Sequence, residues 1–392
     1  MREVVIVSAA RTPIGSFQGS LSSLPATKLG SVAIAEAVRR ASLEPGQVDE
    51  VIMGCVLSAG LGQAPARQAA LGAGLPVSVG ALTINKVCGS GLKAVMLATQ
   101  AIQTGDTEIV VAGGMESMSQ APYLLDRARP GYRLGGGRLI DAMIHDGLWD
   151  PYHQFHMGMC GELCAETYQI SREAQDAFAM RSYQRALKAQ QEGCLKAEIV
   201  PVEVFGRNAE PVLVEEDEEP KRADLNRLPS LRPAFKEGGT ITAGNAPSVN
   251  DGAAALVLMS EQKARVLGLQ PLARIVGQAT ASLAPEWFTI APADAIKKVL
   301  QKTGLTLQEI DLFEINEAFA VVALAVMRLL DLEEERVNIH GGAVALGHPI
   351  GCSGAKILTT LLFAMAEKGA RRGLASLCLG GGEAVAVIVE RG

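Results

Sequence analysis

The apolar residues of this chain fall into short runs rich in β-branched side chains, separated by segments in which apolar positions recur every three or four residues. The short runs are typical of buried strands, and the longer spacing is typical of amphipathic helices. Their alternation predicts an α/β protein. The predicted strands include residues 4–7, 51–53, 109–112, 255–259, 312–315 and 384–389, and the predicted helices include residues 29–41, 91–103, 292–303 and 354–368.

The pattern of the first part of the chain recurs near its end. Residues 33–49 align without a gap with residues 295–311, with small and apolar positions matching. The same offset places the region of Cys88 opposite that of His348, each followed by glycine and a predicted helix. A matching order of helix, strand, reactive residue and helix predicts a duplicated fold.

A long segment interrupts the first copy. It has no counterpart in the second copy and is rich in Gly, Pro and charge, which is typical of an insertion that shapes a binding site. The predicted organisation is an N-terminal half of residues 1–118 and 246–268, an inserted loop domain of residues 119–245, and a C-terminal half of residues 269–392.

Composition narrows the classes of protein. Of 392 residues, 48% are hydrophobic and 20% charged, as in a soluble globular protein, and the net charge of -6 argues against a nucleic-acid partner. Seven cysteines without a regular spacing indicate a reducing compartment. No signal peptide, membrane-spanning apolar stretch or peroxisomal address is recognised. We therefore expect a cytoplasmic protein with no membrane partner.

Cys88 is the first candidate for chemistry. It lies in the motif NKVCGSGLK (residues 85–93), directly before a predicted helix. Unpaired N–H groups and the helix dipole at such a position favour a thiolate, and the flanking glycines let a ligand approach closely. A cysteine nucleophile is the sharper hypothesis, and a buried structural cysteine is the alternative.

Three further residues lie at ends of predicted elements. His348, in GHPIG (residues 347–351), can exchange a proton with a cysteine, although it could also merely cap a loop. Cys378 precedes the glycine run 380–382, whose backbone N–H groups could hold an oxyanion. Asn316, in NEAF (residues 316–319), could hold a water or polarise a carbonyl.

Two other clusters could bind ligands. Lys221, Arg222, Arg227, Arg232 and Lys236 form a basic strip that suits a phosphate, although it could be an ordinary solvated loop. Four residues at helical spacing could be taken for a zinc site, but the glycines between them and the nearby methionines favour an apolar pocket wall, and no metal is expected. These four are His153, His156, Cys160 and Cys164.

Together these motifs, with GGMESMSQAP (residues 113–122) and SAARTPIG (residues 8–15), resemble the thiolases over essentially the whole chain. The details are most similar to the biosynthetic acetyl-CoA acetyltransferases. The resemblance implies a duplicated five-layer α-β-α-β-α fold with an inserted loop domain, homotetramers built as dimers of dimers, and reversible condensation of two acetyl-CoA by ping-pong chemistry. Coenzyme A would be a substrate and product, with no separate cofactor.

The resemblance also assigns roles. Cys88 would take the acyl group, His348 would activate it, and Cys378 would remove a proton from acetyl-CoA. Asn316 with His348 would place an oxyanion-holding water, and the backbone N–H groups of Cys88 and Gly380 would form a second oxyanion site. The positions matched to coenzyme A contacts are His156, Met157, Lys221, Leu231, Ala234, Phe235, Ala243, Ala246, Ser248, Ala318 and Phe319.

The chain departs from the family pattern at a few positions. Pro247 stands where the family has a serine, with Ser248 following, and Glu383 replaces an apolar residue beside the glycine run. These departures bear on substrate length, so a thiolase of longer chain length in fatty acid degradation is an alternative. Three more distant candidates are a ketoacyl synthase, which would not need Cys378, a cysteine hydrolase, which would not explain the duplication, and a non-catalytic coenzyme A or lipid-binding homologue.

Overall fold

The structure is a computed structural model that describes residues 2–205 and 210–392. Within these residues the largest sheet has ten strands in the order β14-β15-β16-β13-β1-β12-β5-β3-β4, with β2 beside β12. Two half-sheets are joined where β1 pairs with β13, through Val5 with Arg274 and Ile6 with Ala273. The strands are β1 (Val4–Arg11), β2 (Gly15–Ser16), β3 (Glu50–Gly54), β4 (Gly80–Ile84), β5 (Ile109–Ser117), β12 (Asn250–Ser260), β13 (Ala273–Ser282), β14 (Leu312–Ile315), β15 (Arg372–Leu379) and β16 (Glu383–Glu390).

The two half-sheets repeat one another, as the sequence predicts. The order β1-β12-β5-β3 matches β13-β16-β15-β14, and each series has two antiparallel pairs followed by one parallel pair. A short 3₁₀ turn before β3, at Pro45–Gln47, carries a reciprocal capping box, and so does the turn before β14, at Leu307–Glu309. The duplicated fold is therefore confirmed, whereas the exact domain limits stay predictions.

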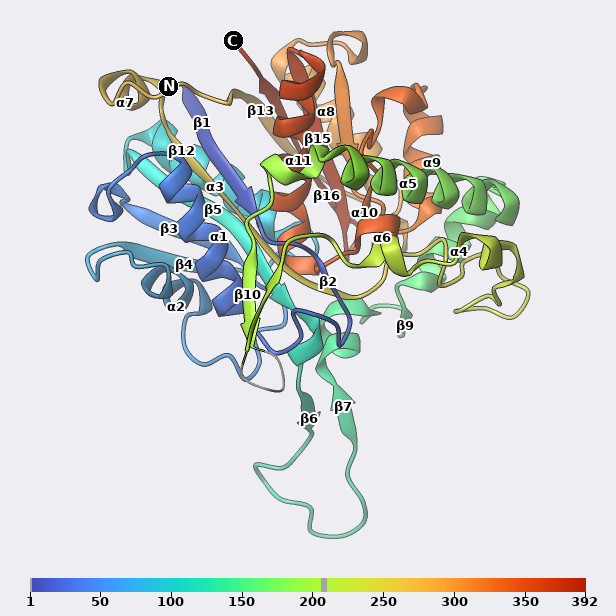
Figure 1. The fold of residues 1–392 in the computed structure, drawn as a ribbon. Helices are drawn as coiled ribbons and strands as arrows, with labels where there is room; N and C mark the ends of the chain where they lie inside the picture. Colours follow the sequence, from blue (N-terminus) through green and yellow to red (C-terminus); the bar gives the residue numbers. More distant parts are fainter. Residues whose placement is uncertain (1, 206–209) are drawn as a thin grey trace.

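The helices and half-sheets form five layers (Figure 1). Helices α3 and α11 lie between the half-sheets, where their apolar residues share one core with side chains from both. The outer faces of the half-sheets are covered by α1 and α2 on one side and by α8 and α9 on the other. These helices are α1 (Ala26–Arg40), α2 (Pro65–Gly72), α3 (Ser90–Thr104), α8 (Ala291–Thr303), α9 (Ala320–Leu330) and α11 (Ile350–Lys368).

The central helices approach closely because glycine faces glycine. A Cβ at Gly91 of α3 would lie 2.7 Å from the backbone nitrogen of Ala355, and a Cβ at Gly354 of α11 would lie 2.4 Å from that of Leu92. Only glycine, which has no Cβ, permits the backbones of the two helices to come this close. The contact is made within the first two turns of each helix, so the segments preceding α3 and α11 are brought together.

Helix α11 is long and apolar enough to cross a membrane by length and composition alone. The sequence-based prediction that no apolar stretch approaches this length is therefore wrong. However, 83% of the apolar window is buried inside the protein, between the two half-sheets. Its hydrophobicity is explained by burial on every side, which removes the polar face that a surface helix would show.

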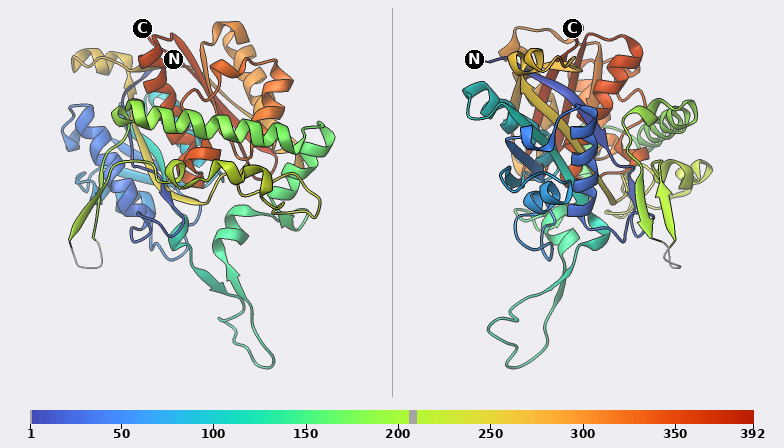
Figure 2. Two further views of the ribbon diagram at one scale, coloured as in Figure 1. Left: turned by 45° about the vertical axis from the view of Figure 1, so that its right-hand side comes forward. Right: turned by 60° about the vertical axis from the view of Figure 1, so that its left-hand side comes forward.

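The inserted segment packs over the C-terminal half and extends one arm away from it (Figure 2). Helix α5 packs on α9 and α10 (Ala343–Leu346), and the hairpin β6-β7 projects from the body. Buried Arg11 of β1 fastens the segment by pairing with Asp217 at 2.7 Å and Glu198 at 2.7 Å. Other elements are β6 (Tyr123–Leu125), β7 (Leu139–Asp141), β8 (Trp149–Asp150), β9 (Phe155–His156), α4 (Gly158–Thr167), α5 (Arg172–Glu192), β10 (Val202–Phe205), β11 (Pro211–Val214), α6 (Glu219–Arg222) and, outside the segment, α7 (Glu261–Val266).

Candidate active site

A pocket of about 240 Å³ opens where the two halves and the inserted segment meet. Cys88, His348 and Gly380 line it together, although they come from opposite halves of the chain. This is the convergence of helix ends that the internal repeat predicts. The remaining lining is mostly apolar and consists of Met118, Met143, Ile144, Gly147, Leu148, His156, Met157, Phe235, Ala246, Pro247, Ser248, Val249, Phe288, Ala318, Phe319 and Ile350.

Cys88 is held on a strained turn two residues before α3. The preceding residue, Val87, has a φ of 45°, a left-handed conformation that a β-branched side chain rarely adopts. Ser90 locks this turn, because its Oγ accepts from the Lys86 N–H at 2.8 Å and donates to the Val87 carbonyl at 2.7 Å. Backbone strain of this kind persists only where the surroundings over-determine it, and it is concentrated at functional sites.

The pKa of Cys88 differs from the sequence expectation. Burial of the sulfur raises the pKa to about 12, although the backbone N–H groups of Gly380 and of Cys88 itself lower it, and nearby Glu116 raises it further. The expected lowering by the helix N-terminus is therefore outweighed by desolvation. Without a bound substrate Cys88 is a thiol, and its ionisation requires a base.

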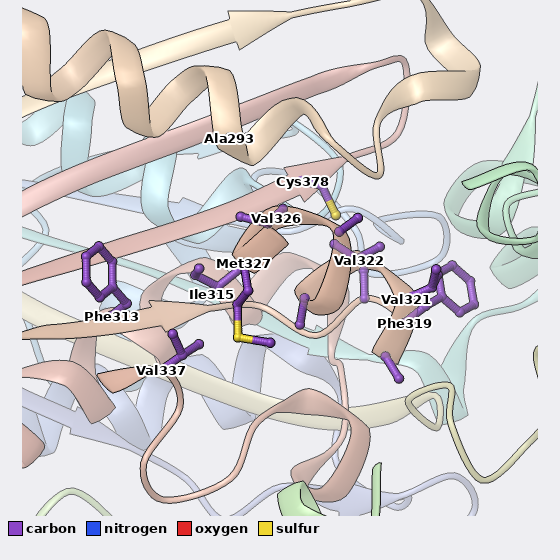
Figure 3. Packing of buried hydrophobic residues seen from close by; sticks show 14 of the residues in the cluster. Ala293, Phe313, Ile315, Phe319, Val321, Val322, Val326, Met327, Val337 and Cys378 are labelled. Carbon is purple, nitrogen blue, oxygen red and sulfur yellow. The ribbon is translucent and has the colours of Figure 1, made fainter. Parts of the chain in front are cut away.

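Cys378 lies at the end of β15 and belongs to the same apolar cluster as residues of α9 and β14, among them Val322 and Val326 (Figure 3). Burial raises its pKa well above the ordinary value, and the charge of Cys88 adds to this shift. The two sulfurs are thus electrostatically coupled, so that a thiolate at one opposes a thiolate at the other. Cys378 does not line the pocket itself, but it lies two residues before Gly380, which does, and near enough to Cys88 to feel its charge.

His348 precedes α11 and is fixed through both backbone and ring. Its N–H donates to Asn250 Oδ1 at 2.8 Å, and its Nδ1 lies 2.6 Å from Ser353 Oγ. Since Ser353 Oγ donates its single proton to the Pro349 carbonyl at 3.0 Å, we assign the Nδ1–H tautomer to His348. Nε2 is then an unprotonated acceptor, and no described residue is its hydrogen-bond partner.

The ring of His348 is neutral near neutral pH. Burial and the charge of Lys356 lower its pKa to about 3. Asn316, at the end of β14, is also buried, and neither its Oδ1 nor its Nδ2 has a partner among the described residues. Together with His348 Nε2, the two Asn316 atoms supply donors and acceptors that a water or a substrate carbonyl can use.

Sequence reasoning missed three residues that organise this site. Asn250 positions the His348 backbone, Ser353 orients its ring, and Glu116 accepts N–H groups from Val56 at 3.0 Å, Leu57 at 3.1 Å and Gly351 at 2.9 Å. Glu116 thereby ties the start of α11 to the N-terminal half, and burial raises its pKa to about 7. It lies within the motif of residues 113–122, but only the fold shows what it contacts.

The residues matched to coenzyme A contacts do not all line the reactive pocket. Seven of them line the reactive pocket, where His156 stacks on Phe235 with ring centroids 4.6 Å apart. Leu231 and Ala243 instead line a neighbouring pocket with Arg222 and Arg227, and Lys221 lines two further surface pockets. Ala234 lines neither the reactive pocket nor its neighbour. The seven are His156, Met157, Phe235, Ala246, Ser248, Ala318 and Phe319.

Much of the basic strip is neutralised by its own carboxylates. Lys221 pairs with Glu216, and Arg222 pairs with Glu218 at 2.9 Å. The His/Cys cluster is dispersed: His153 approaches Asp150 at 3.2 Å, whereas Cys160 and Cys164 are buried in α4. Within the described residues the donor atoms of that cluster do not gather into a ligand group.

Glu383, a departure from the family pattern, joins the two halves at the site. Its carboxylate accepts from Lys86 Nζ at 2.5 Å and from Ser282 Oγ at 3.1 Å. The ion pair connects the turn that carries Cys88 with the loop that carries Gly380. Ser248, next to the other departure at Pro247, donates to Asn250 Oδ1 at 2.9 Å, the atom that also holds His348.

Comparisons with known proteins agree with this arrangement. Residues 4–262 match the family model for the thiolase N-terminal domain, and residues 269–391 match that for the thiolase C-terminal domain. The chain is 56% identical to acetyl-CoA acetyltransferase 1 of Arabidopsis thaliana, covering 99% of this chain and 94% of that protein. It is 52% identical to acetyl-CoA acetyltransferase of Pseudomonas aeruginosa, covering both chains fully.

A solved structure extends the agreement to the fold. The crystal structure of the Bacillus anthracis acetyl-CoA acetyltransferase superposes with a TM-score of 0.97 at 47% identity, covering 100% of this chain and 99% of that one. Both the family models and these relatives span the two halves that build the pocket. The chain belongs to the thiolase family.

Proposed function

We propose that this protein is an acetyl-CoA C-acetyltransferase, which condenses two acetyl-CoA to acetoacetyl-CoA and coenzyme A and catalyses the reverse thiolysis. The observation that carries this proposal is the convergence of Cys88, His348 and Gly380 in one pocket with Cys378 near Cys88. The names of relatives that match over the full length support the same reaction.

In the first half-reaction Cys88 Sγ attacks the carbonyl carbon of acetyl-CoA. Its proton passes to His348 Nε2, the unprotonated nitrogen of the assigned tautomer, and then to the sulfur of departing coenzyme A. The lowered pKa of His348 keeps the ring neutral at neutral pH, so Nε2 carries a free lone pair that can accept this proton. The product is an acetyl thioester on Cys88.

In the second half-reaction Cys378, acting as a thiolate, removes a proton from the α-carbon of a second acetyl-CoA. The resulting carbanion attacks the acetyl carbonyl and Cys88 leaves as a thiolate. The proton held by Cys378 then passes to Cys88, which restores both sulfurs to their starting states. Burial is the main cause of the raised pKa of Cys378, and acetylation of Cys88 prevents a second thiolate from forming beside it and raising that pKa further. The proposed kinetics are therefore ping-pong.

Two oxyanion sites would stabilise developing charge. The backbone N–H groups of Gly380 and Cys88, which lower the pKa of the Cys88 sulfur, would hold the acetyl thioester oxygen. Asn316 and His348 Nε2 carry unsatisfied polar atoms suited to holding a water against the carbonyl of the second substrate. Each such donor contributes about 3 kcal/mol to lowering the barrier.

We favour a short acyl chain over the longer chains of a degradative thiolase, because the relatives that match over the full length are named acetyl-CoA acetyltransferases. Met143, Leu148, Met157 and Phe288 line the apolar wall of the pocket that would receive this chain. A non-catalytic homologue is less well supported, since the four candidate catalytic side chains are all present.

The test is thiolysis of acetoacetyl-CoA, followed by its loss of absorbance, in wild type, Cys88→Ala and Cys378→Ala. Both variants should lose turnover, but labelled acetyl-CoA should still acetylate Cys378→Ala and not Cys88→Ala. If 3-ketohexanoyl-CoA or longer substrates are cleaved faster than acetoacetyl-CoA, the longer-chain function replaces the one proposed. Normal turnover by Cys88→Ala would refute the nucleophile.

We also propose a cytoplasmic homotetramer, built as a dimer of dimers, that takes part in fatty acid metabolism and uses coenzyme A only as a substrate and product. The projecting β6-β7 arm supports assembly, because it exposes Tyr123, Leu125, Leu134 and Leu139. Light scattering of the full chain, compared with a variant carrying serine at Leu134 and Leu139, tests the tetramer.

A further inference from the structure

A second group of reactive side chains lies away from the pocket, where three segments of the chain meet. Cys194 opens the turn after α5 in the inserted segment, His340 lies in the loop before α10, and Glu367 lies in the last turn of α11. Their donor atoms all lie within 4.8 Å of one another. None of the three lines the reactive pocket.

The contacts within this group are incomplete. His340 is only 6% exposed, and its Nε2 lies 3.0 Å from Glu367 Oε2, yet this nitrogen has no aligned hydrogen-bond partner among the described residues. The other carboxylate oxygen, Oε1, already accepts from Lys368 Nζ at 2.6 Å. A buried ring nitrogen without an aligned hydrogen bond needs an explanation, and an ion bound by both the ring and the carboxylate is one.

We propose that Cys194, His340 and Glu367 form a binding site for a divalent transition-metal ion, Zn²⁺ in the first place. Sulfur, imidazole nitrogen and carboxylate oxygen are the three ligand types that Zn²⁺ takes, and three protein ligands leave a fourth position for water. Ligand atoms around tetrahedral zinc lie roughly 3.5 Å apart. A side-chain movement of about 1 Å therefore closes the group around an ion.

The surroundings allow an ion to enter and to be held. The group opens into a surface pocket of about 480 Å³, in which Arg185, Lys188 and Lys368 are balanced by Glu192, Glu335 and Glu367. Burial lowers the pKa of His340, so its ring is neutral and able to ligate near neutral pH. Burial and the Glu367 charge raise the pKa of Cys194, so binding would release a thiol proton.

Metal binding would cross-link the inserted segment to the C-terminal half. The three ligands belong to segments that are distant in sequence, and an ion that binds the folded chain stabilises it by mass action. The site is separate from Cys88 and His348, so the protein should turn over substrate both with and without the bound ion.

The test is titration of the metal-free protein with Co²⁺, which reports ligation by its thiolate-to-metal charge-transfer absorption, followed by displacement with Zn²⁺. Wild type should bind one Co²⁺ per chain with this absorption, and Cys194→Ser and His340→Gln should lose it, with affinity reduced at least about tenfold. Glu335→Gln, which removes a carboxylate from the same pocket but no ligand, should bind normally.

Thermal melting gives a second readout. Zn²⁺ should raise the Tm of wild type and Glu335→Gln but not that of Cys194→Ser or His340→Gln, whose melting without metal also shows whether they are folded. Equal Co²⁺ absorption in wild type and Cys194→Ser would place the ion on other thiols and overturn the proposal. So would the absence of charge-transfer absorption in wild type.

Discussion

Replacing Ser353 with alanine tests whether ring orientation at His348 controls the acyl transfer. The change removes the only described partner of Nδ1, at 2.6 Å, and also the bond from Ser353 Oγ to the Pro349 carbonyl. Without its acceptor, the Nδ1–H tautomer loses its advantage, and a larger share of rings carries the proton on Nε2. Those rings cannot take a proton from Cys88.

The expected loss follows from the hydrogen bond. A net hydrogen bond contributes about 0.5–1.5 kcal/mol, and leaving a buried N–H unpaired costs about 1–3 kcal/mol. A loss of about 1–2 kcal/mol in the transition state lowers kcat about 5- to 30-fold. Because the pKa of His348 is about 3, the ring stays neutral in both proteins, so the loss should be constant between about pH 6 and 8.

The assay is rapid-quench acetylation of Cys88 by acetyl-CoA, together with kcat and KM for thiolysis. Thr359→Val is the matched control: Thr359 is also fully buried in α11, and its described hydrogen bond goes to a carbonyl four residues earlier, at 2.9 Å, rather than to a histidine. It should be destabilised similarly while keeping its acetylation rate. If the rate of Cys88 acetylation in Ser353→Ala is within about twofold of the rate in Thr359→Val, the tautomer argument is wrong.

Three further predictions concern the same pocket. Since burial raises the pKa of Cys88 to about 12, its alkylation by iodoacetamide should rise about tenfold per pH unit from pH 7 to 9, and a plateau below pH 9 would contradict the shift. Gly347→Ala should lower the free energy of unfolding by about 2 kcal/mol or more, measured by urea denaturation, because φ is +94° and a Cβ would lie 2.4 Å from the Asn250 side chain; a smaller loss means that Asn250 moves freely. Glu383→Ala should reduce kcat/KM a few-fold, because it removes a partly exposed ion pair with Lys86 that contributes about 0.2–1 kcal/mol. Exchanging the two charged residues between positions 86 and 383 should restore part of the lost kcat/KM.

Much of the fold could be predicted from local pattern. The strand at 312–315 is found with the same bounds, and predicted helices such as 292–303 and 91–103 are extended by a residue or two at one or both ends. Regular spacing of apolar residues determines these elements because each must bury one face, and the internal repeat determines that the two halves share one topology. The positions of Cys88 and His348 before equivalent helices follow from the same repeat.

What the sequence determined is therefore the set of elements, their duplication and the residues capable of chemistry. Tertiary structure decided their environment: desolvation raises rather than lowers the pKa of Cys88, and the Ser353 contact selects the tautomer of His348. It also decided that Glu116 and Asn250 hold the site together and that Cys194, His340 and Glu367 meet. Burial and contacts between residues far apart in the chain depend on how whole layers pack, and no local pattern of residues contains that information.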